Sequence, residues 1–395
     1  MARTTCLLTA LALAGCSDGG HVDVVVHRIA LADAQVSVVF TDPDGMSRTA
    51  DVDADGHASG EIVTGGTVTL ARLIGGSADL TAYTDVQPGS TLEFGPPEVD
   101  HPSRGTMTIT GDVPPGADQI QIAAVCRSNS TSPGVQKITL DDRCGATVDL
   151  LLVGVKFVNP NNVNVAYIYL PAQPIVDGGT IALDPTAWRP PEPITIHIHG
   201  ADGMFEQPNN SVYLTDSFGV RTYDVRAAHD TVTATMPLAG TFALSAMLTR
   251  VPALGQTLYV DLPAVAAQDL DFAGVLAPWV MQHDRSWSVD DVGGALVASA
   301  LVADYKWTQP IANYTEDVQL RVISAAPPPG KLPFPNLPAP LAKYQPGPDF
   351  QIEATARLVR AEGLADIPVA RAAEAGTGIG SGPLGGGSLA VTSRF

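Results

Sequence analysis

Two histidines stand one residue apart in the segment His197-Ile198-His199, which lies in an alternating apolar stretch. Because side chains alternate across a β-strand, both imidazoles would face one side of a sheet, where they could bind a metal ion. Two histidines alone leave the coordination of zinc incomplete. The sequence therefore favours a solvated polar strand face, and a metal-dependent enzyme that uses His197 and His199 is the alternative.

Three carboxylates alternate in Asp51-x-Asp53-x-Asp55-Gly56. This spacing matches the opening of a calcium loop, in which alternate carboxylates wrap the ion and the glycine permits a sharp turn. The twelfth position, which should supply a bidentate Glu, is Ile62. An acidic β-hairpin tip is therefore the favoured interpretation. A Ca²⁺-stabilised adhesin is the alternative, and no other cofactor is expected.

Two tryptophans, Trp279 and Trp287, lie on either side of the polar stretch 282–285. Aromatic faces offer a large contact area at low entropic cost. Both residues are therefore candidate contacts for a protein or carbohydrate partner.

Motifs of the common catalytic families are missing. The sequence contains no Gly-x-Ser-x-Gly, Ser-x-x-Lys, His-Glu-x-x-His or P-loop lysine. A Gly-x-Gly-x-x-Gly begins at Gly380, but it stands in a low-complexity stretch without room for the helix and strand of a dinucleotide site. These observations predict a protein that is not an enzyme.

The first sixteen residues have the order of a secretory signal: one positive charge, a short apolar run, small residues and then Cys16. Residues 13–16, Leu-Ala-Gly-Cys, resemble the lipobox of bacterial lipoproteins. The resemblance implies that residues 1–15 are removed and that Cys16 is acylated, so that 16–21 form a lipidated tether. Ser17, where an Asp would retain the protein at the inner membrane, implies an outer-membrane destination.

Two further cysteines, Cys126 and Cys144, follow the signal region. An even pair in an oxidising compartment favours one disulfide, which would add about 3 kcal/mol of stability by closing a short loop. No Cys-x-x-Cys is present, so a redox or zinc role has little support.

The elements that must position these residues are strands. The 38 glycines and 32 prolines favour many short elements joined by turns. Alternating apolar and polar residues predict strands at 36–40, 67–70, 119–122, 194–198 and 350–354. The predicted fold class is all-β, with tandem antiparallel β-sandwich (Ig-like) domains and little helix beyond the signal peptide.

Residues 22–100 contain an Asp-x-x-Gly hairpin followed by a Gly-x-aliphatic strand. They resemble the carboxypeptidase-regulatory-like and bacterial immunoglobulin-like β-sandwich families, which implies a spacer or binding module without catalytic residues.

Proline clusters predict the remaining boundaries. One sandwich, with the Cys126–Cys144 disulfide, is expected at 101–193 and another at 194–280. A C-terminal β domain at 281–395 would contain a Pro-rich segment at 326–348 and a Gly-rich segment at 376–387. The Pro-rich segment is expected to be an extended spacer or a connection laid over a domain.

The formal net charge of −19 makes nucleic acid an improbable partner, because an acidic surface repels phosphates. Acidic residues at hairpin tips, among them Asp42 and Asp53, are expected to form a solvated rim. Together the sequence predicts a lipid-anchored cell-envelope protein with a structural or partner-binding role.

Overall fold

The computed structural model describes nineteen stretches of the chain. They are residues 19–27, 35–95, 102–124, 127–132, 136–158, 161–199, 211–216, 222–225, 231–238, 241–251, 254–263, 265–271, 279–283, 286–290, 300–311, 314–325, 331–332, 334–362 and 388–394.

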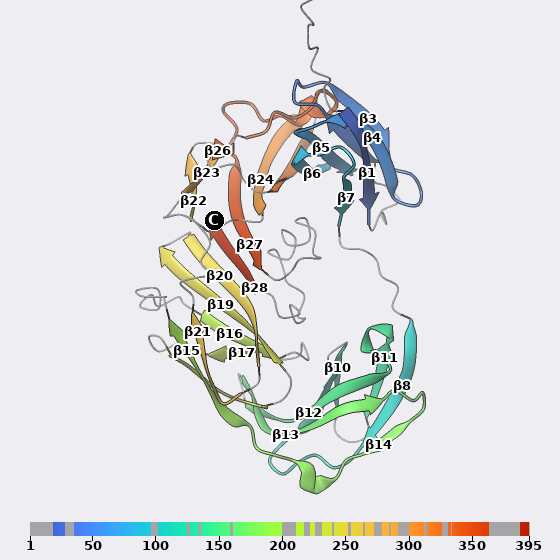
Figure 1. Cartoon of the computed structure of the whole chain (residues 1–395), viewed down its shortest axis with the longest axis vertical. Coiled ribbons are helices and arrows are strands. Elements are labelled where there is room, and N and C mark those ends of the chain that lie inside the picture. Colours follow the sequence, from blue (N-terminus) through green and yellow to red (C-terminus); the bar gives the residue numbers. More distant parts are fainter. Residues whose placement is uncertain are drawn as a thin grey trace, which may run out of the picture. The chain divides into compact units, whose positions relative to one another are not determined.

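The described residues confirm an all-β fold (Figure 1). Helical structure among them is confined to three short 3-10 segments, η1 (Asp142–Cys144), η2 (Pro185–Ala187) and η3 (Ala339–Tyr344). None of the helices in this part of the chain is long and apolar enough to cross a membrane.

The chain divides into two compact units. Unit 1 comprises Met1–Gly95, Thr308–Val318 and Asn336–Pro348, and unit 2 comprises Pro96–Trp307, Gln319–Pro335 and Asp349–Phe395. The sequence division into four domains remains a prediction.

The first module, in unit 1, is a sandwich of two sheets with the strand orders β4-β1-β7 and β3-β2-β5-β6. Its strands are β1 (Gly19–Val26), β2 (Gln35–Thr41), β3 (Ser47–Asp51), β4 (His57–Val63), β5 (Gly66–Ile74), β6 (Ser77–Val86) and β7 (Thr91–Phe94). The two sheets meet closely at Gly60 of β4, where a Cβ atom would lie only 2.6 Å from the ring of Phe40 on β2. Glycine is therefore required at this position because the aromatic ring occupies the space of a side chain.

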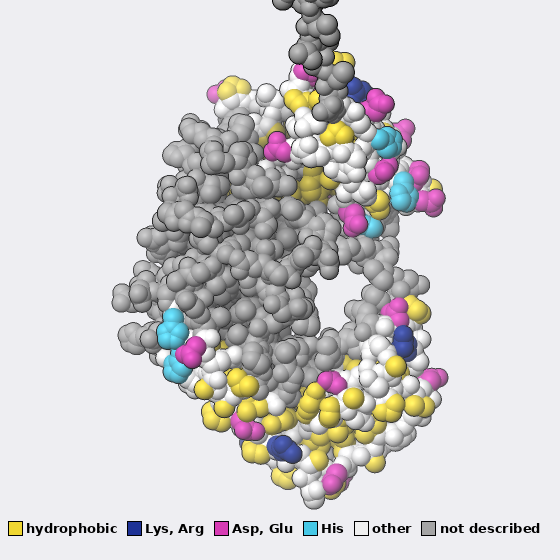
Figure 2. All heavy atoms as spheres, in the orientation of Figure 1, with side chains coloured by type: hydrophobic (Ala, Val, Ile, Leu, Met, Phe, Trp, Pro, Cys, Tyr) yellow, Lys and Arg dark blue, Asp and Glu magenta, His cyan; other side chains and the backbone are white. Residues whose placement is uncertain are grey.

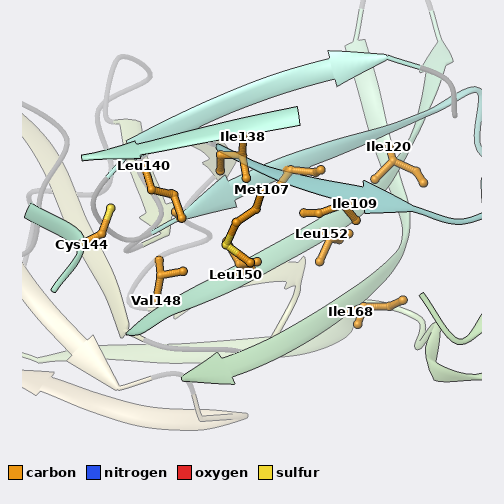
Figure 3. Close-up of a cluster of buried hydrophobic side chains, with 12 residues drawn as sticks. Met107, Ile109, Ile120, Ile138, Leu140, Cys144, Val148, Leu150, Leu152 and Ile168 are labelled. Carbon is orange, nitrogen blue, oxygen red and sulfur yellow. The ribbon is translucent and has the colours of Figure 1, made fainter. Parts of the chain in front are cut away.

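The second module, in unit 2, has the orders β11-β8-β14 and β10-β9-β12-β13. Its strands are β8 (Ser103–Thr110), β9 (Gln119–Ala124), β10 (Arg127–Ser132), β11 (Gln136–Asp141), β12 (Thr147–Val158), β13 (Asn161–Pro174) and β14 (Thr180–Ala182). Figure 3 shows side chains from both sheets meeting in one core, with Met107 and Ile138 on one side and Leu150 and Leu152 on the other. Alternation along each strand places these apolar residues on the inner face.

The third module, also in unit 2, has the orders β18-β15-β21 and β17-β16-β19-β20. Its strands are β15 (Glu192–His199), β16 (Ser211–Asp216), β17 (Thr222–Val225), β18 (Thr231–Met236), β19 (Thr241–Val251), β20 (Leu254–Pro263) and β21 (Ala267–Asp271).

These three modules repeat one topology of seven consecutive strands. The first strand pairs antiparallel with the fourth and parallel with the seventh, as β1, β8 and β15 show. The other four strands form a sheet in the order third-second-fifth-sixth. The chain is thus built from tandem sandwiches of equivalent connectivity.

The last seven strands, the fourth module, vary this plan. They are β22 (Trp279–His283), β23 (Ser286–Asp290), β24 (Ala300–Ile311), β25 (Tyr314–Ala325), β26 (Lys331–Leu332), β27 (Glu353–Glu362) and β28 (Ser388–Arg394). The orders β22-β23-β26 and β25-β24-β27-β28 match the other modules if β23 is taken as the first strand and β28 as the sixth. Strand β22 then pairs with β23 in antiparallel sense, on the side where the other modules hold a parallel seventh strand.

One sequence expectation needs correction in the C-terminal part, because the strand expected at 350–354 begins only at Glu353. For the Pro-rich segment, the described residues fit the alternative of a connection laid over a domain, since Leu341 and Tyr344 of η3 are buried. The Gln309 side-chain amide also donates to the Lys343 carbonyl at 2.6 Å, which ties this segment down.

Candidate functional site

The His197/His199 pair lies on β15, the central strand of the sheet β18-β15-β21. Ile194 and Ile196 are fully buried, whereas both histidines are exposed, as strand alternation requires. The sheet register places His197 opposite Asp269 of the parallel strand β21.

One of the two histidines, His199, contacts a carboxylate. The His199 Nε2 atom lies 3.0 Å from the Asp269 Oδ1 atom, and the two side chains are 59% and 74% exposed. Figure 2 shows histidine side chains beside an acidic one over the region where β15 lies. A contact this exposed is screened by water and salt, so it contributes little to stability.

A metal centre needs more ligands than this. Over the described residues, no group of three or more His, Cys, Asp or Glu side chains is placed to hold a metal ion. His197, His199 and Asp269 do not form such a group. The metal-dependent enzyme therefore stays a prediction.

The acidic segment 51–56 forms the turn between β3 and β4. The Asp53 Oδ1 atom accepts hydrogen bonds from the backbone N–H groups of Asp55 at 3.0 Å and His57 at 2.8 Å. The backbone N–H of Asp53 donates to the His57 carbonyl at 2.9 Å, which closes the hairpin. Asp53 therefore serves as the internal cap of a turn, while Asp51 and Asp55 are exposed. Calcium binding here remains a prediction.

The tryptophan candidates fall on neighbouring strands of one hairpin. Trp279 on β22 pairs with Asp290, and Trp287 on β23 pairs with Gln282. Trp287 also stands opposite Leu332 of β26. The side chains of both tryptophans are outside the described part, so their role as partner contacts remains a prediction.

The cysteines are only partly described. Cys16 and Cys126 lie outside the described residues, whereas Cys144 ends η1 and is 7% exposed in the core of the second module (Figure 3). Acylation of Cys16 and the Cys126–Cys144 bridge therefore remain predictions.

A buried carboxylate that the sequence assigned to the solvated rim is Asp42, which is only 6% exposed. Its Oδ1 atom accepts from the Val63 backbone N–H at 2.9 Å, and its Oδ2 atom accepts from the Arg48 guanidinium at 2.9 Å. The expectation was wrong for this residue because these two donors replace water. A signal for this role was the Asp-Pro-Asp-Gly turn that begins at Asp42.

An ionic cluster that sequence reasoning missed lies across β25, β24 and β27. The Asp304 carboxylate accepts from Arg321 Nε at 2.7 Å and also from Arg357. Burial lowers the pKa of the Arg357 guanidinium; Arg321 adds to the lowering and Asp304 opposes it. Since Asp304 and Arg357 are 53 positions apart, only the fold brings them together.

A second missed carboxylate is Asp149 on β12. Its Oδ2 atom accepts from the Tyr169 hydroxyl at 2.6 Å, and its Oδ1 atom accepts from the Ala172 backbone N–H at 2.7 Å. Ala172 has a φ of 49°, where β13 shifts register against β12. Burial, followed by the hydrogen bond and charge of Asp149, raises the pKa of Tyr169 to about 12. Asp149 and Tyr169 therefore stabilise β13 at its irregular position.

Comparisons with known proteins give no family. No family model and no curated protein matches the chain. Among solved structures, the TIE protein of Bacillus anthracis is 11% identical with a TM-score of 0.17, and the match covers 64% of this chain and 50% of that one. The chain thus spans half the length of the TIE protein.

Two pilins are similarly distant. BcpA, the major pilin subunit of Bacillus cereus, is 10% identical with a TM-score of 0.16, and the match covers 64% of this chain and 98% of BcpA. A streptococcal ancillary pilin is 9% identical with a TM-score of 0.14, and the match covers 64% of this chain and 99% of that one. Scores this low carry no argument about what the chain does.

Proposed function

We propose that the chain is a lipid-anchored protein of the cell envelope whose β-sandwich modules have a non-catalytic structural or partner-binding role. The observation that carries the proposal is the seven-strand sandwich topology that the chain repeats. Repeated sandwiches of this kind suit spacing and adhesion, because loops and strand edges offer contact surface on a stable support.

Four carboxylates of the described residues support a structural role. Asp42, Asp53, Asp149 and Asp304 each accept hydrogen bonds that fix a turn, a bulge or a sheet. A catalytic carboxylate must instead be free to exchange a proton with substrate.

The anchor is proposed from the sequence around Cys16, with the outer membrane as the destination. Several acyl chains on one residue would hold the protein at a bilayer without any spanning helix. We also propose that residues 22–100 form a carboxypeptidase-regulatory-like module. Nucleic acid is not among the proposed partners.

Fractionation of cells that express the full chain tests the proposal. We expect the wild-type chain in the membrane fraction, resistant to salt and alkaline wash but released by detergent. Cys16→Ser should move it to the soluble fraction, whereas Cys126→Ser, the matched control, should leave it with the membrane. A wild-type chain that is soluble, or a Cys16→Ser chain that stays with the membrane, contradicts the anchor.

A further inference from the structure

The second sheet of the first module continues into a strand from the C-terminal part of the chain. In the strand order, β6 is followed by β25. The backbone N–H of Asp317 on β25 donates to the carbonyl of Gly76, directly before β6, at 3.3 Å. A strand edge that is paired no longer presents a row of backbone donors and acceptors. The compact unit that contains the first module accordingly includes Thr308–Val318.

A second C-terminal segment belongs to the same unit. Asn336–Pro348 is part of it and contains η3. This short helix lies next to β3, the strand at the other end of the sheet order β6-β5-β2-β3. C-terminal residues therefore meet the first module at both of the strands that end its own part of the sheet.

Burial of two side chains holds this second segment in place. Leu341 and Tyr344 of η3 are only 4% and 1% exposed. Tyr344 is one of the largest fully buried side chains in the described part of the chain. Because a buried aromatic ring removes a large apolar area from water, we expect Tyr344 to contribute most to the docking of η3.

Hydrogen bonds join the segment to β24 and give it a defined shape. The Gln309 side chain, which is 4% exposed, donates to the Lys343 carbonyl at 2.6 Å. The Gln345 side-chain carbonyl accepts from the Leu337 backbone N–H at 2.6 Å. Buried polar groups need such partners because water does not reach them. The end of the β24–β25 hairpin and Asn336–Pro348 are therefore bonded together.

The charge of the second segment suits the first module. Asn336–Pro348 contains Lys343 and no acidic residue, whereas Gly19–Phe94 contains more acidic than basic residues. The Lys343 ammonium also lies 4.6 Å from the centre of the Tyr344 ring, which is a cation–π contact. Attraction between opposite charges thus acts in the same direction as burial.

We propose that Thr308–Val318 and Asn336–Pro348 form a C-terminal clasp, which docks on the first module at β6 and β3 and holds it without a covalent bond. The stretch Pro96–Trp307 separates the first module from the clasp in sequence, so the clasp links both ends of this stretch. A chain that is cut directly after the first module therefore keeps this module bound. The proposal does not depend on the lipid anchor.

Cleavage of the full chain tests the clasp. A site for a sequence-specific protease is inserted between Pro97 and Glu98 of the chain that carries Cys16→Ser, which removes any acyl group. After cleavage, we expect two pieces that elute together in gel filtration at micromolar concentration and separate only in denaturant. Two pieces that separate in buffer overturn the proposal.

Tyr344→Ala in the cleavable chain removes the largest buried contact of the clasp. We expect this change to raise the dissociation constant of the two pieces by about a hundredfold. Phe157→Ala is the matched control, since Phe157 is an aromatic residue of unit 2 that is 54% exposed, and it should leave the dissociation constant unchanged. A dissociation constant that Tyr344→Ala does not raise overturns the proposal.

Hydrogen exchange of the uncut chain shows whether Tyr344→Ala acts on the first module. We expect faster exchange of backbone amides in β3 and β6 of this variant. The strands β9 and β12 of the second module should keep their exchange rates, which shows that the variant is folded elsewhere. Unchanged exchange in β3 and β6, or equally faster exchange in all four strands, overturns the proposal.

Discussion

At the scale of single residues, three carboxylates in the described part of the chain accept hydrogen bonds from the backbone. Asp53 accepts two backbone N–H groups, Asp42 accepts one together with Arg48, and Asp149 accepts one together with Tyr169. Each satisfies a donor that a turn, a loop or a bulge would otherwise leave without a partner. Some acidic residues of the sequence therefore stabilise individual turns.

The turn at Asp53 gives a prediction that separates structure from calcium binding. Asp53→Ala removes the acceptor of two hydrogen bonds and should lower the free energy of unfolding by about 1 kcal/mol. Because the loss is structural, denaturant unfolding should show the same decrease in chelator and in millimolar calcium. Asp55→Ala, which keeps its backbone N–H, is the control and should be neutral. Calcium that stabilises the wild type but not Asp53→Ala would instead support a metal site.

The Tyr169 hydroxyl gives a pH-dependent prediction. Its pKa is raised from 10.0 to about 12 in the folded chain, so the folded state favours the neutral phenol. This contribution is fully present below pH 10 and is lost as the pH rises towards 12. Unfolding midpoints measured from pH 9 to 12 should therefore fall more steeply for the wild type than for Tyr169→Phe. Parallel curves for the two proteins would show that Tyr169 titrates normally.

At the scale of elements, β24 depends on an ionic group in the middle of its sheet. Asp304 separates two arginines, Arg321 and Arg357, whose side chains are 34% and 14% exposed. Asp304→Asn should destabilise the protein by about 2 kcal/mol, because two cations then face each other with less compensation. Chemical denaturation provides the measurement.

Asp317→Asn is the matched control for this experiment. Asp317 lies on β25, is exposed, and accepts a hydrogen bond from the Thr308 hydroxyl at 2.7 Å. Its replacement should change the free energy of unfolding by less than about 0.5 kcal/mol. If the two variants lose similar amounts of unfolding free energy, the ionic cluster at Asp304 does not stabilise the protein more than an exposed hydrogen bond does.

The second module carries the disulfide prediction. If Cys126 and Cys144 are bridged, reductant should destabilise the wild type by about 3 kcal/mol and should not affect Cys126→Ser. The loss appears as a lower midpoint of urea unfolding. Identical midpoints with and without reductant would exclude the bridge.

Local pattern predicts strands such as β15, although it misplaces the start of β27, and it does not predict which strands pair. The alternation at 194–198 predicts β15 and its exposed histidines, and the structure agrees. The partner of His199, Asp269, is 70 positions away on a parallel strand, and no local pattern indicates such a neighbour. Asp304 and Arg357 are also far apart in sequence, by 53 positions, so no local pattern indicates their contact either.

At the scale of the whole molecule, seven-strand connectivity repeats although the sequence shows no fixed period. The recurrent phrase Gly-Thr-x-Thr or Gly-Thr-x-Ala opens strands of different positions: Gly66 begins β5, whereas Thr180 begins β14. The phrase therefore indicates where a strand starts, and it does not indicate where a seven-strand module starts. Repetition became visible only from strand pairing, since sandwiches tolerate wide variation in loops and spacing.

The proposed anchor holds these sandwiches at a bilayer through acyl chains on Cys16. Mass spectrometry of the N-terminal peptide, released by protease from protein extracted with detergent, is its sharpest test. We expect a peptide that begins at Cys16 and carries acyl mass, and we expect this peptide to be absent from Cys16→Ser cells. An unmodified peptide that begins elsewhere, or one that contains Cys16 internally, would contradict it.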